Sequence, residues 1–274
     1  MGERTVRIRK VKGSNPSVST IQESSFCLAR QKSFFVVKDV GVYTQTDKSE
    51  YVSDIMSICG NNTFWDRTWE SVDPKRTTAN ITGFDMAEDV MIRILHMRHA
   101  ENICDAGCGC GAYSLKLSRY GFFVSGFDIA ERAVSLTKEL LSENGYPAES
   151  FKTADVLSTG YADGCFDAVV ARDMIDHMPI RQGAEAVNEL LRIVRPGGCV
   201  LLTLDMTDSE YESEPHIKND DGDYLYVQGK WDGMVFHPYS PGDIKKLAGE
   251  NRYEILSSGD HGFIVILETG EQTA

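Results

Sequence analysis

The 274-residue sequence predicts an α/β fold: a doubly wound, mostly parallel sheet with helices on both faces. Strand-like and helix-like segments alternate from residue 102 to residue 205, and such alternation is typical of parallel strands joined by right-handed crossovers. The last two predicted strands, 253–258 and 263–268, are separated by only four residues. A connection that short requires antiparallel pairing, so one antiparallel strand is expected near the C-terminus.

The elements of this sheet follow one another in a regular order. Apolar and β-branched runs mark the strands, and helices are recognised by their 3.6-residue apolar period and by the Gly or Pro that follows them. In the segment 61–99 the period predicts helices, with an apolar stripe of Met86, Val90, Ile94 and Met97. Strands are expected at 102–106, 122–128, 151–155, 166–172 and 199–205, and helices at 112–120, 130–144, 183–194 and 242–248, with the segment 195–198 ending the third of these helices.

The first 60 residues differ from the rest of the chain. They lack a helical period, although 33–37 and 40–43 are compatible with short strands. Residues 1–38 hold eight Lys or Arg and two Glu, a net charge of +6. The net charge of the whole chain is −13, so residues 39–274 carry −19. We therefore expect a basic, partly disordered N-terminal extension (1–60) before a globular domain (61–274). Because the domain is acidic, it repels polyphosphate, and nucleic acid is not an expected partner.

The composition of the sequence also indicates where in the cell the protein is expected. No run approaches the roughly 20 apolar residues of a membrane helix, and no apolar leader precedes the domain. The seven cysteines are irregularly spaced, which does not indicate a disulfide framework. We expect a cytoplasmic protein that does not interact with membranes.

The stretch ICDAGCGCGAYSL (103–115) lies between the first parallel strand and the helix that follows it. Gly107, Gly109 and Gly111 allow a tight turn and a close approach of a ligand to the backbone. Asp128 ends the second strand about 21 residues after Gly107, a suitable place for an acid that accepts hydrogen bonds from ribose hydroxyls. The combination favours an adenosine-containing cofactor. No fourth Cys or His stands at zinc-ligand spacing from Cys104, Cys108 and Cys110, so no metal is expected.

At these residues the sequence resembles the class I S-adenosylmethionine-dependent methyltransferases. The resemblance implies a Rossmann-like fold and methyl transfer from S-adenosylmethionine, with S-adenosylhomocysteine as product, to an O, N or C atom of a small-molecule acceptor. It covers about residues 61–269. The motifs that carry it are DAGCGCG (105–111), GFDIA (126–130), TADV (153–156), FDAVVARDMIDHM (166–178), LLRIVRPGGCVLLT (190–203) and the leader Phe64-Trp65-Asp66.

The resemblance also implies roles for single residues. Asp105 would bind the methionine amino group, directly or through water, and Asp128 the ribose. Asp155 would accept from the adenine amino group, and Arg172 and Asp173 would lie near the methionine part and the reacting methyl. The cofactor-binding residues implied are Asp105, Ala106, Gly107, Cys108, Gly109, Gly111, Asp128, Ile129, Asp155, Val156 and Arg172.

Few side chains are needed for the chemistry, because a sulfonium methyl is already activated and the barrier falls mainly through positioning and desolvation. A general base is needed only when the acceptor must lose a proton. His177, in the loop after the fourth strand, is the first candidate, His237 the second, and Asp173 could orient the acceptor.

The acceptor is expected to be selected by segments outside the sheet. The insertion 206–239 contains a predicted hairpin, 224–227 with 234–237, that could form a lid. Eight acids between 205 and 223 leave two hypotheses open, a solvated acidic loop and a cationic acceptor. The candidate acceptor-binding residues are Tyr224 and Trp231 in the insertion and Phe64, Trp65 and Trp69 opposite it.

Three other functions compete with small-molecule methyl transfer. A Rossmann-like sheet is also typical of NAD-dependent oxidoreductases. A protein that binds S-adenosylmethionine without turnover would keep the same cofactor motifs. An RNA or protein methyltransferase would use the basic N-terminal extension. The acceptor and the oligomeric state are not encoded in any motif of the sequence.

Overall fold

The computed structural model describes residues 34–37, 41–44, 62–72, 86–257 and 262–270. The chain divides into two compact units, 1–45 and 46–274. In the first unit, β1 (Phe34–Val37) and β2 (Gly41–Thr44) pair antiparallel, at the places where the sequence predicts two short strands. The remainder of the predicted N-terminal extension lies outside the described residues.

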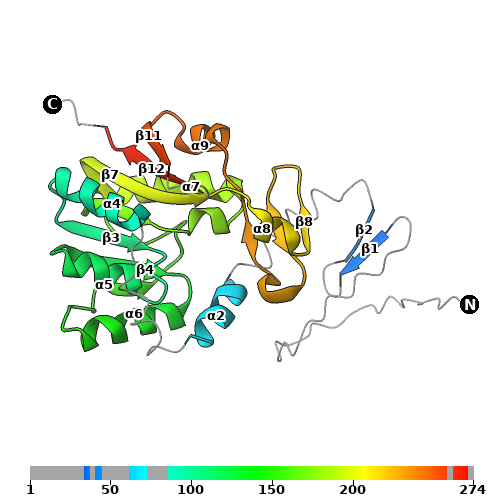
Figure 1. The fold of residues 1–274 in the computed structure, drawn as a ribbon, viewed down its shortest axis with the longest axis horizontal. Coiled ribbons are helices and arrows are strands. Elements are labelled where there is room, and N and C mark those ends of the chain that lie inside the picture. Colours follow the sequence, from blue (N-terminus) through cyan, green and yellow to red (C-terminus); the bar gives the residue numbers. More distant parts are fainter. Residues whose placement is uncertain (1–33, 38–40, 45–61, 73–85, 258–261, 271–274) are drawn as a thin grey trace, which may run out of the picture. The chain divides into compact units, whose positions relative to one another are not determined.

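The second unit is built on a seven-stranded sheet with the order β11-β12-β7-β6-β3-β4-β5 (Figure 1). Strands β3 to β7 run parallel, whereas β12 pairs antiparallel with both β7 and β11. The predicted mostly parallel sheet with one antiparallel strand is therefore confirmed. The bounds are β3 Asn102–Ala106, β4 Phe123–Asp128, β5 Phe151–Thr153, β6 Phe166–Ala171, β7 Val194–Asp205, β11 Arg252–Ser257 and β12 Gly262–Glu268.

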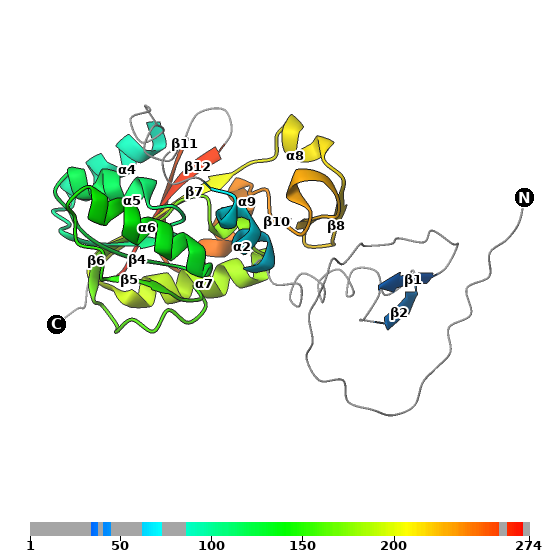
Figure 2. The same cartoon turned by 90° about the horizontal axis from the view of Figure 1, so that it is seen from below.

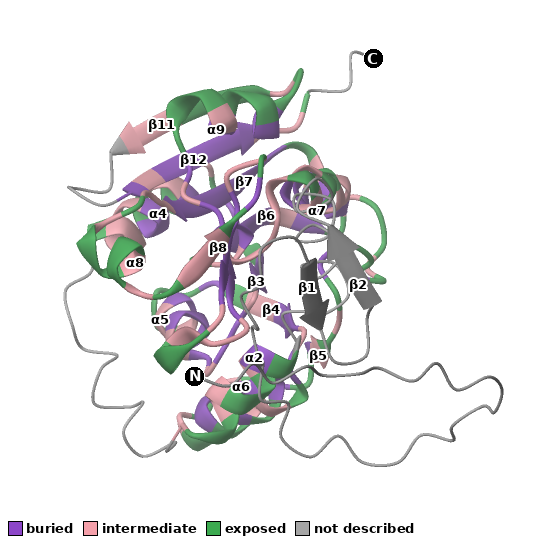
Figure 3. Ribbon diagram, turned by 90° about the vertical axis from the view of Figure 1, so that its right-hand side faces the viewer, coloured by how far each residue is buried: buried purple, intermediate pink, exposed green. Residues whose placement is uncertain are grey.

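Helices cover both faces of this sheet, with α4, α5 and α6 on one side and α7 on the other (Figure 2). Successive side chains of a strand point to opposite faces of the sheet, so each strand contributes to the apolar core on both faces. In β3, Ile103 packs with α4 and α5, while Cys104 packs with α7 and α9. The helices are α4 Met86–Met97, α5 Ala112–Arg119, α6 Glu131–Glu143, α7 Ile180–Ile193 and α9 Pro241–Ala248. Figure 3 shows the inner strand β12 mostly buried, whereas the edge strand β11 is not.

Several predicted details of these elements are wrong, each for a long-range reason. On α4 the buried face is Met91, Ile92 and Leu95, while the predicted stripe ends at Met86 and Met97, which are exposed. The apolar residues of α4 cover a wide arc, and only packing on the sheet selects which part of that arc is buried.

Two boundaries also differ. Helix α7 begins at Ile180 and not at residue 183, because the Ile180 N–H donates to the Asp223 carboxylate at 3.0 Å. Strand β7 already begins at Val194 and runs through the segment 195–198, where a turn was expected. The guanidinium of Arg195 donates to Asp167 at 2.6 Å and holds this segment beside β6.

The insertion after β7 forms a small subdomain, here called the lid (residues 206–239). Its three strands, β8 His216–Lys218, β9 Tyr224–Tyr226 and β10 Val235–Phe236, are antiparallel, so the predicted hairpin is confirmed. The lid also holds α8 (Ser209–Ser213) and the short 3₁₀ helix η3 (Gly229–Trp231). Phe64 of helix α2 (Asn62–Glu70) joins a buried cluster with Tyr224, Tyr226, Met234 and Phe236, which packs α2 against the lid.

Candidate functional site

A cavity of about 360 Å³ lies at the edge of the sheet where the parallel strands end. The carboxyl ends of parallel strands meet at one edge, and open α/β sheets bind ligands there. Four loops line the cavity, those after β3, β4, β5 and β6. The end of β4, helix α2 and one residue each of α7 and β10 complete the lining. Its lining residues are Trp65, Trp69, Gly107, Phe127, Asp128, Ile129, Ala154, Asp155, Val156, Leu157, Asp173, Met174, His177, Met178, Pro179, Gln182 and Val235.

The glycine loop after β3 has a backbone that other residues adopt only with strain. Gly109 and Gly111 have φ values of +54° and +83°, in the left-handed region. A Cβ on Gly111 would lie 2.8 Å from the Thr137 Cα of helix α6, and one on Gly109 would lie 2.8 Å from the Trp69 ring. Any side chain at Gly109 or Gly111 would therefore clash with α2 or α6.

Asp128, at the end of β4, organises this loop. Its side chain is buried, and Oδ2 accepts from the Gly109 N–H at 2.9 Å. Oδ1 accepts from the Ala130 N–H, also at 2.9 Å, where helix α6 begins. An ionised carboxylate has about four acceptor positions. The remaining acceptor capacity faces the cavity, so Asp128 both orders the glycine loop and can accept from hydroxyl groups of a ligand.

Asp105 lies behind the cavity and does not line it. It is 2% exposed, and Ser114 Oγ donates to its Oδ2 at 2.5 Å. Burial raises the pKa of this carboxyl to about 6, against the opposing effects of the Ser114 hydrogen bond and the nearby Arg172 charge. Asp105 is thus a buried acid whose charge is stabilised by any cation that comes close.

Ile129, Asp155 and Val156 line the other end of the cavity. Asp155 Oδ1 accepts from the Leu157 N–H at 2.9 Å, which orders the turn after β5. Two apolar side chains flank this end and a carboxylate lies beside them, which is an environment suited to a heteroaromatic ring with an amino group.

Arg172 and Asp173 follow β6 but have different surroundings. The Arg172 guanidinium is 2.7 Å from Glu88 of α4 and 3.7 Å from Asp173, and it does not line the cavity. Asp173 does line it, with a left-handed φ of +48° that is unusual outside glycine. Thr203 Oγ1 donates to the Asp173 carboxylate at 2.6 Å and accepts from its N–H at 2.9 Å, which holds this strained residue in place.

His177 closes the short 3₁₀ helix η2 (Ile175–His177) and lies at the junction of two cavities. Its ring packs edge-on against Trp65, with centroids 5.0 Å apart. Burial lowers the pKa of His177 to about 4, and the Asp173 charge and the Val235 backbone only partly offset this effect. The imidazole is therefore neutral at physiological pH.

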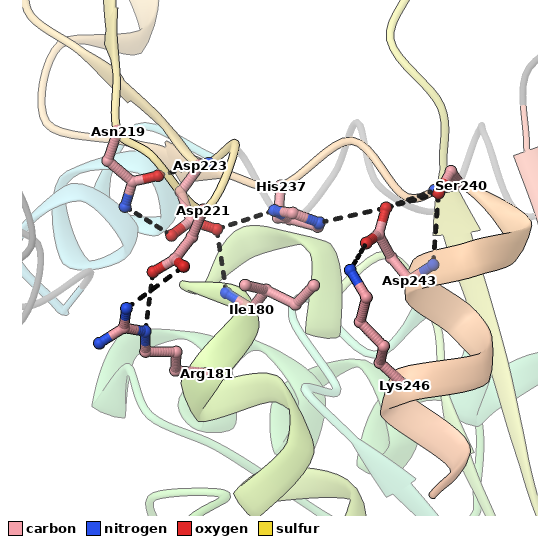
Figure 4. A network of polar contacts seen from close by, with 9 residues as sticks. All are labelled: Ile180, Arg181, Asn219, Asp221, Asp223, His237, Ser240, Asp243 and Lys246. Atoms are coloured by element: carbon pink, nitrogen blue, oxygen red, sulfur yellow. Dashed lines mark hydrogen bonds and ion pairs between the residues drawn. The ribbon is translucent and has the colours of Figure 1, made fainter.

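His237, the second base candidate, lies in neither cavity. It is 2% exposed, with Nδ1 2.8 Å from Asp223 Oδ1 and Nε2 4.0 Å from Asp243 Oδ2 (Figure 4). Asp223 also accepts from the Ile180 N–H, the first of helix α7. The histidine therefore joins the lid to α7 and α9.

A second cavity, here called the groove, has a volume of about 630 Å³ and lies between α2 and the lid. Phe64, Trp65 and Trp231, all predicted from the sequence, line it, whereas Tyr224 is 2% exposed and donates to Glu212 at 2.6 Å. Trp69 lines the first cavity. The lining of the groove is Phe64, Trp65, Arg67, Thr68, Ser71, His177, Tyr211, Gly229, Lys230, Trp231, Asp232 and Met234.

Sequence reasoning missed several lining residues. Met174, Met178 and Gln182 lie within or just after the motif 166–178, so proximity to that motif was an available signal. Tyr211 and Val235 come from the lid, where only the tertiary structure selects which side chains face a cavity.

The cysteines of the glycine loop are surrounded by protein. Cys104 and Cys108 are buried, and burial raises the pKa of both thiols well above the ordinary value. Since zinc binds thiolates, such thiols are poor ligands. Among the described residues no group of three or more His, Cys, Asp or Glu is arranged to hold a metal ion.

Comparison with known proteins finds similarity to methyltransferases over part of the chain. Residues 103–198 match the family model described as "Methyltransferase domain". The chain is 35% identical over 101 residues to 2-methyl-6-phytyl-1,4-hydroquinone methyltransferase of Synechocystis, covering 36% of this chain and 30% of the relative. It is 28% identical over 145 residues to 27-O-demethylrifamycin SV methyltransferase of Amycolatopsis mediterranei, covering 51% and 48%.

The chain therefore spans about half or less of the length of these curated relatives. A solved structure of magnesium protoporphyrin IX methyltransferase from Synechocystis superposes with a TM-score of 0.53 at 17% identity, covering 77% of this chain and 98% of that one. This similarity shows a shared fold. Within the described residues, no helix has the length and apolarity needed to span a membrane.

Proposed function

We propose that this protein is a class I S-adenosylmethionine-dependent methyltransferase that transfers a methyl group to a small-molecule acceptor, a proposal supported by the match of residues 103–198 to a methyltransferase domain. The observation that carries the proposal is the bond between Asp128 and the Gly109 N–H, which joins the glycine loop to a carboxylate that lines the cavity. We further propose that the domain covers residues 61–274 and that residues 206–239 act as its substrate lid.

The residues around the cavity fit S-adenosylmethionine. Asp128 would accept from both ribose hydroxyls, and Asp155 from the adenine amino group, with Ile129 and Val156 against the ring. The buried charge of Asp105, and the backbone of the loop Ala106–Gly111, which includes Cys108, would face the methionine part. Arg172 would contribute by holding Asp173 and Glu88 near that end.

The bound cofactor supplies an activated sulfonium methyl group. The protein then has to hold the acceptor in line with that methyl and to exclude water. Trp65 and Trp69 of α2 cover the cavity on one side, while Asp173 and His177 come from the loop after β6. Neutral His177 would take the proton of an acceptor hydroxyl, and Asp173 would orient that group.

The named relatives favour a small molecule as acceptor. One acts on a hydroquinone by its name, and another methylates an oxygen of a rifamycin. Oxygen is therefore our proposed nucleophile. A cationic acceptor remains a separate hypothesis, suggested by the acidic residues between 205 and 223.

Cofactor identity is tested by native mass spectrometry and calorimetry of the purified chain. We expect bound S-adenosylhomocysteine or, after its removal, micromolar binding of S-adenosylmethionine and no binding of NAD. Asp155→Ala should weaken binding. Asp163→Ala should not, because Asp163 does not line the cavity. Binding of NAD in place of S-adenosylmethionine would refute our proposal and favour an oxidoreductase. Loss of activity on deletion of residues 1–38 would indicate a macromolecular acceptor.

A further inference from the structure

The groove between α2 and the lid adjoins the cofactor cavity, because Trp65 and His177 line both. One of its walls is α2, with Phe64, Arg67 and Thr68, and the other is the lid, with Tyr211, Trp231 and Met234. A molecule in the groove therefore lies beside His177, which also borders the cofactor cavity. This position makes the groove the candidate place for the acceptor.

The walls of the groove are aromatic and are held by packing. Tyr211 is stacked on Trp231 with centroids 5.0 Å apart and on Phe236 at 4.0 Å, and Phe64 packs edge-on against Trp65 at 5.0 Å. Rings that support one another in this way need no further ordering on binding. They offer aromatic walls against which a planar ring can pack, beside the polar side chains that also line the groove.

The charges at the groove are mostly positive. Arg67 donates to the main-chain oxygen of Asp232 at 2.8 Å, which leaves its positive charge at the rim. The Lys230 ammonium lies 4.3 Å from the centroid of the Trp231 ring. The protein's own cation thus already takes the cation–π position on this ring. A cationic ligand would have to displace Lys230 and approach Arg67.

Four acidic residues of the lid are engaged away from the groove. Glu210 forms an ion pair with Lys230, Glu212 accepts from Tyr224, and Asp223 is buried against His237. Asp208 caps helix α8. These acids stabilise the lid, and none of the four lines the groove. Asp232 is the acid that does line it.

We propose that the groove binds a hydroxylated aromatic acid, with its ring between α2 and the lid, its hydroxyl at His177 and its carboxylate toward Arg67. The inference rests on the proposed methyltransferase function. In the reaction, the acceptor oxygen forms a bond to the methyl carbon as the methyl–sulfur bond breaks. The hydroxyl proton passes to His177, and the sulfur keeps the electron pair of the broken bond.

Two matched probes test the charge preference. Dihydrocaffeate and dopamine share a catechol ring and a two-carbon chain, and they differ in the charge of the terminal group. Calorimetry with the S-adenosylhomocysteine-loaded protein should give at least tenfold tighter binding of dihydrocaffeate. Arg67→Gln should reduce this acid-to-amine ratio at least fivefold, whereas Arg93→Gln, an exposed arginine of α4 outside both cavities, should leave it unchanged.

The ratio separates recognition of charge from a structural role. If Arg67 only holds α2 to the lid, its loss weakens both probes equally and the ratio stays constant, which would overturn the inference. Equal or tighter binding of dopamine, or no binding of either probe by protein that binds S-adenosylhomocysteine, would also overturn it and leave the proposed function intact. Protein that binds no S-adenosylhomocysteine would instead refute the proposed function.

Discussion

Replacement of Asp128 by Asn is the most direct test of the cofactor site. In the structure its two carboxylate oxygens each accept a backbone N–H at 2.9 Å, from Gly109 and from Ala130. Asparagine keeps one carbonyl oxygen, so at least one of the two hydrogen bonds to the ribose hydroxyls is lost, and a hydrogen bond to a charged acceptor contributes about 1.5–3 kcal/mol. We therefore expect the affinity for S-adenosylmethionine to fall roughly ten- to a hundredfold.

The same substitution also destabilises the folded protein. An asparagine amide has one oxygen, so one of the two N–H groups would face the side-chain NH₂ and lose its acceptor. Leaving a buried donor unsatisfied costs about 1–3 kcal/mol, and we expect a comparable decrease in the free energy of unfolding. Urea unfolding with and without S-adenosylhomocysteine separates this effect from the loss of binding.

Glu139→Gln, on the exposed side of α6, is the matched control and should change neither quantity. The decisive measurement is calorimetry on folded Asp128→Asn protein. If that variant binds S-adenosylmethionine with wild-type affinity, the assignment of the ribose site and the reasoning on the glycine loop are both wrong.

Three further substitutions give distinct outcomes. Burial raises the pKa of Asp105 to about 6, so the folded state keeps a proton that the unfolded chain releases near pH 4. The free energy of unfolding therefore falls by about 3 kcal/mol as the pH rises from about 4 to about 6. Asp105→Asn should lack this pH dependence when urea unfolding is compared at pH 4.5 and 7. His177→Gln should lower methyl transfer to a hydroxyl roughly a hundredfold in a kinetic assay with unchanged cofactor affinity, and the wild-type rate should be flat from about pH 6 to 8 because the pKa of His177 is about 4. Asp223→Asn should lower the free energy of unfolding by about 3 kcal/mol, since His237 and Asp223 form a buried pair at 2.8 Å; an unchanged Tm would contradict that role.

The fold was predictable from the sequence because its signals are local. Alternating apolar runs and 3.6-residue periods mark each strand and helix, and the short connection at 259–262 requires an antiparallel pair. The left-handed φ values at Gly107, Gly109 and Gly111 agree with the reason for which glycine was expected there. Backbone conformation at these positions is a property of the residue and of its nearest neighbours.

The boundaries that were wrong depend on distant partners. The start of α7 is set by a carboxylate 43 positions later in the chain, and the first residues of β7 are held by an ion pair between Arg195 and Asp167. The buried face of α4 is likewise selected by the sheet against which it packs. Local patterns do not contain such contacts.

The architecture, the glycine loop and the place of Asp128 follow from the sequence alone, because each depends on spacing within one strand–loop–helix unit. The different surroundings of the two candidate histidines follow only from the tertiary structure. His177 and His237 both come after a strand, yet one lies at the junction of two cavities and the other is buried against Asp223. The physical reason is that burial and charge around a side chain are set by elements far away in sequence, which here are α2, α7 and the lid.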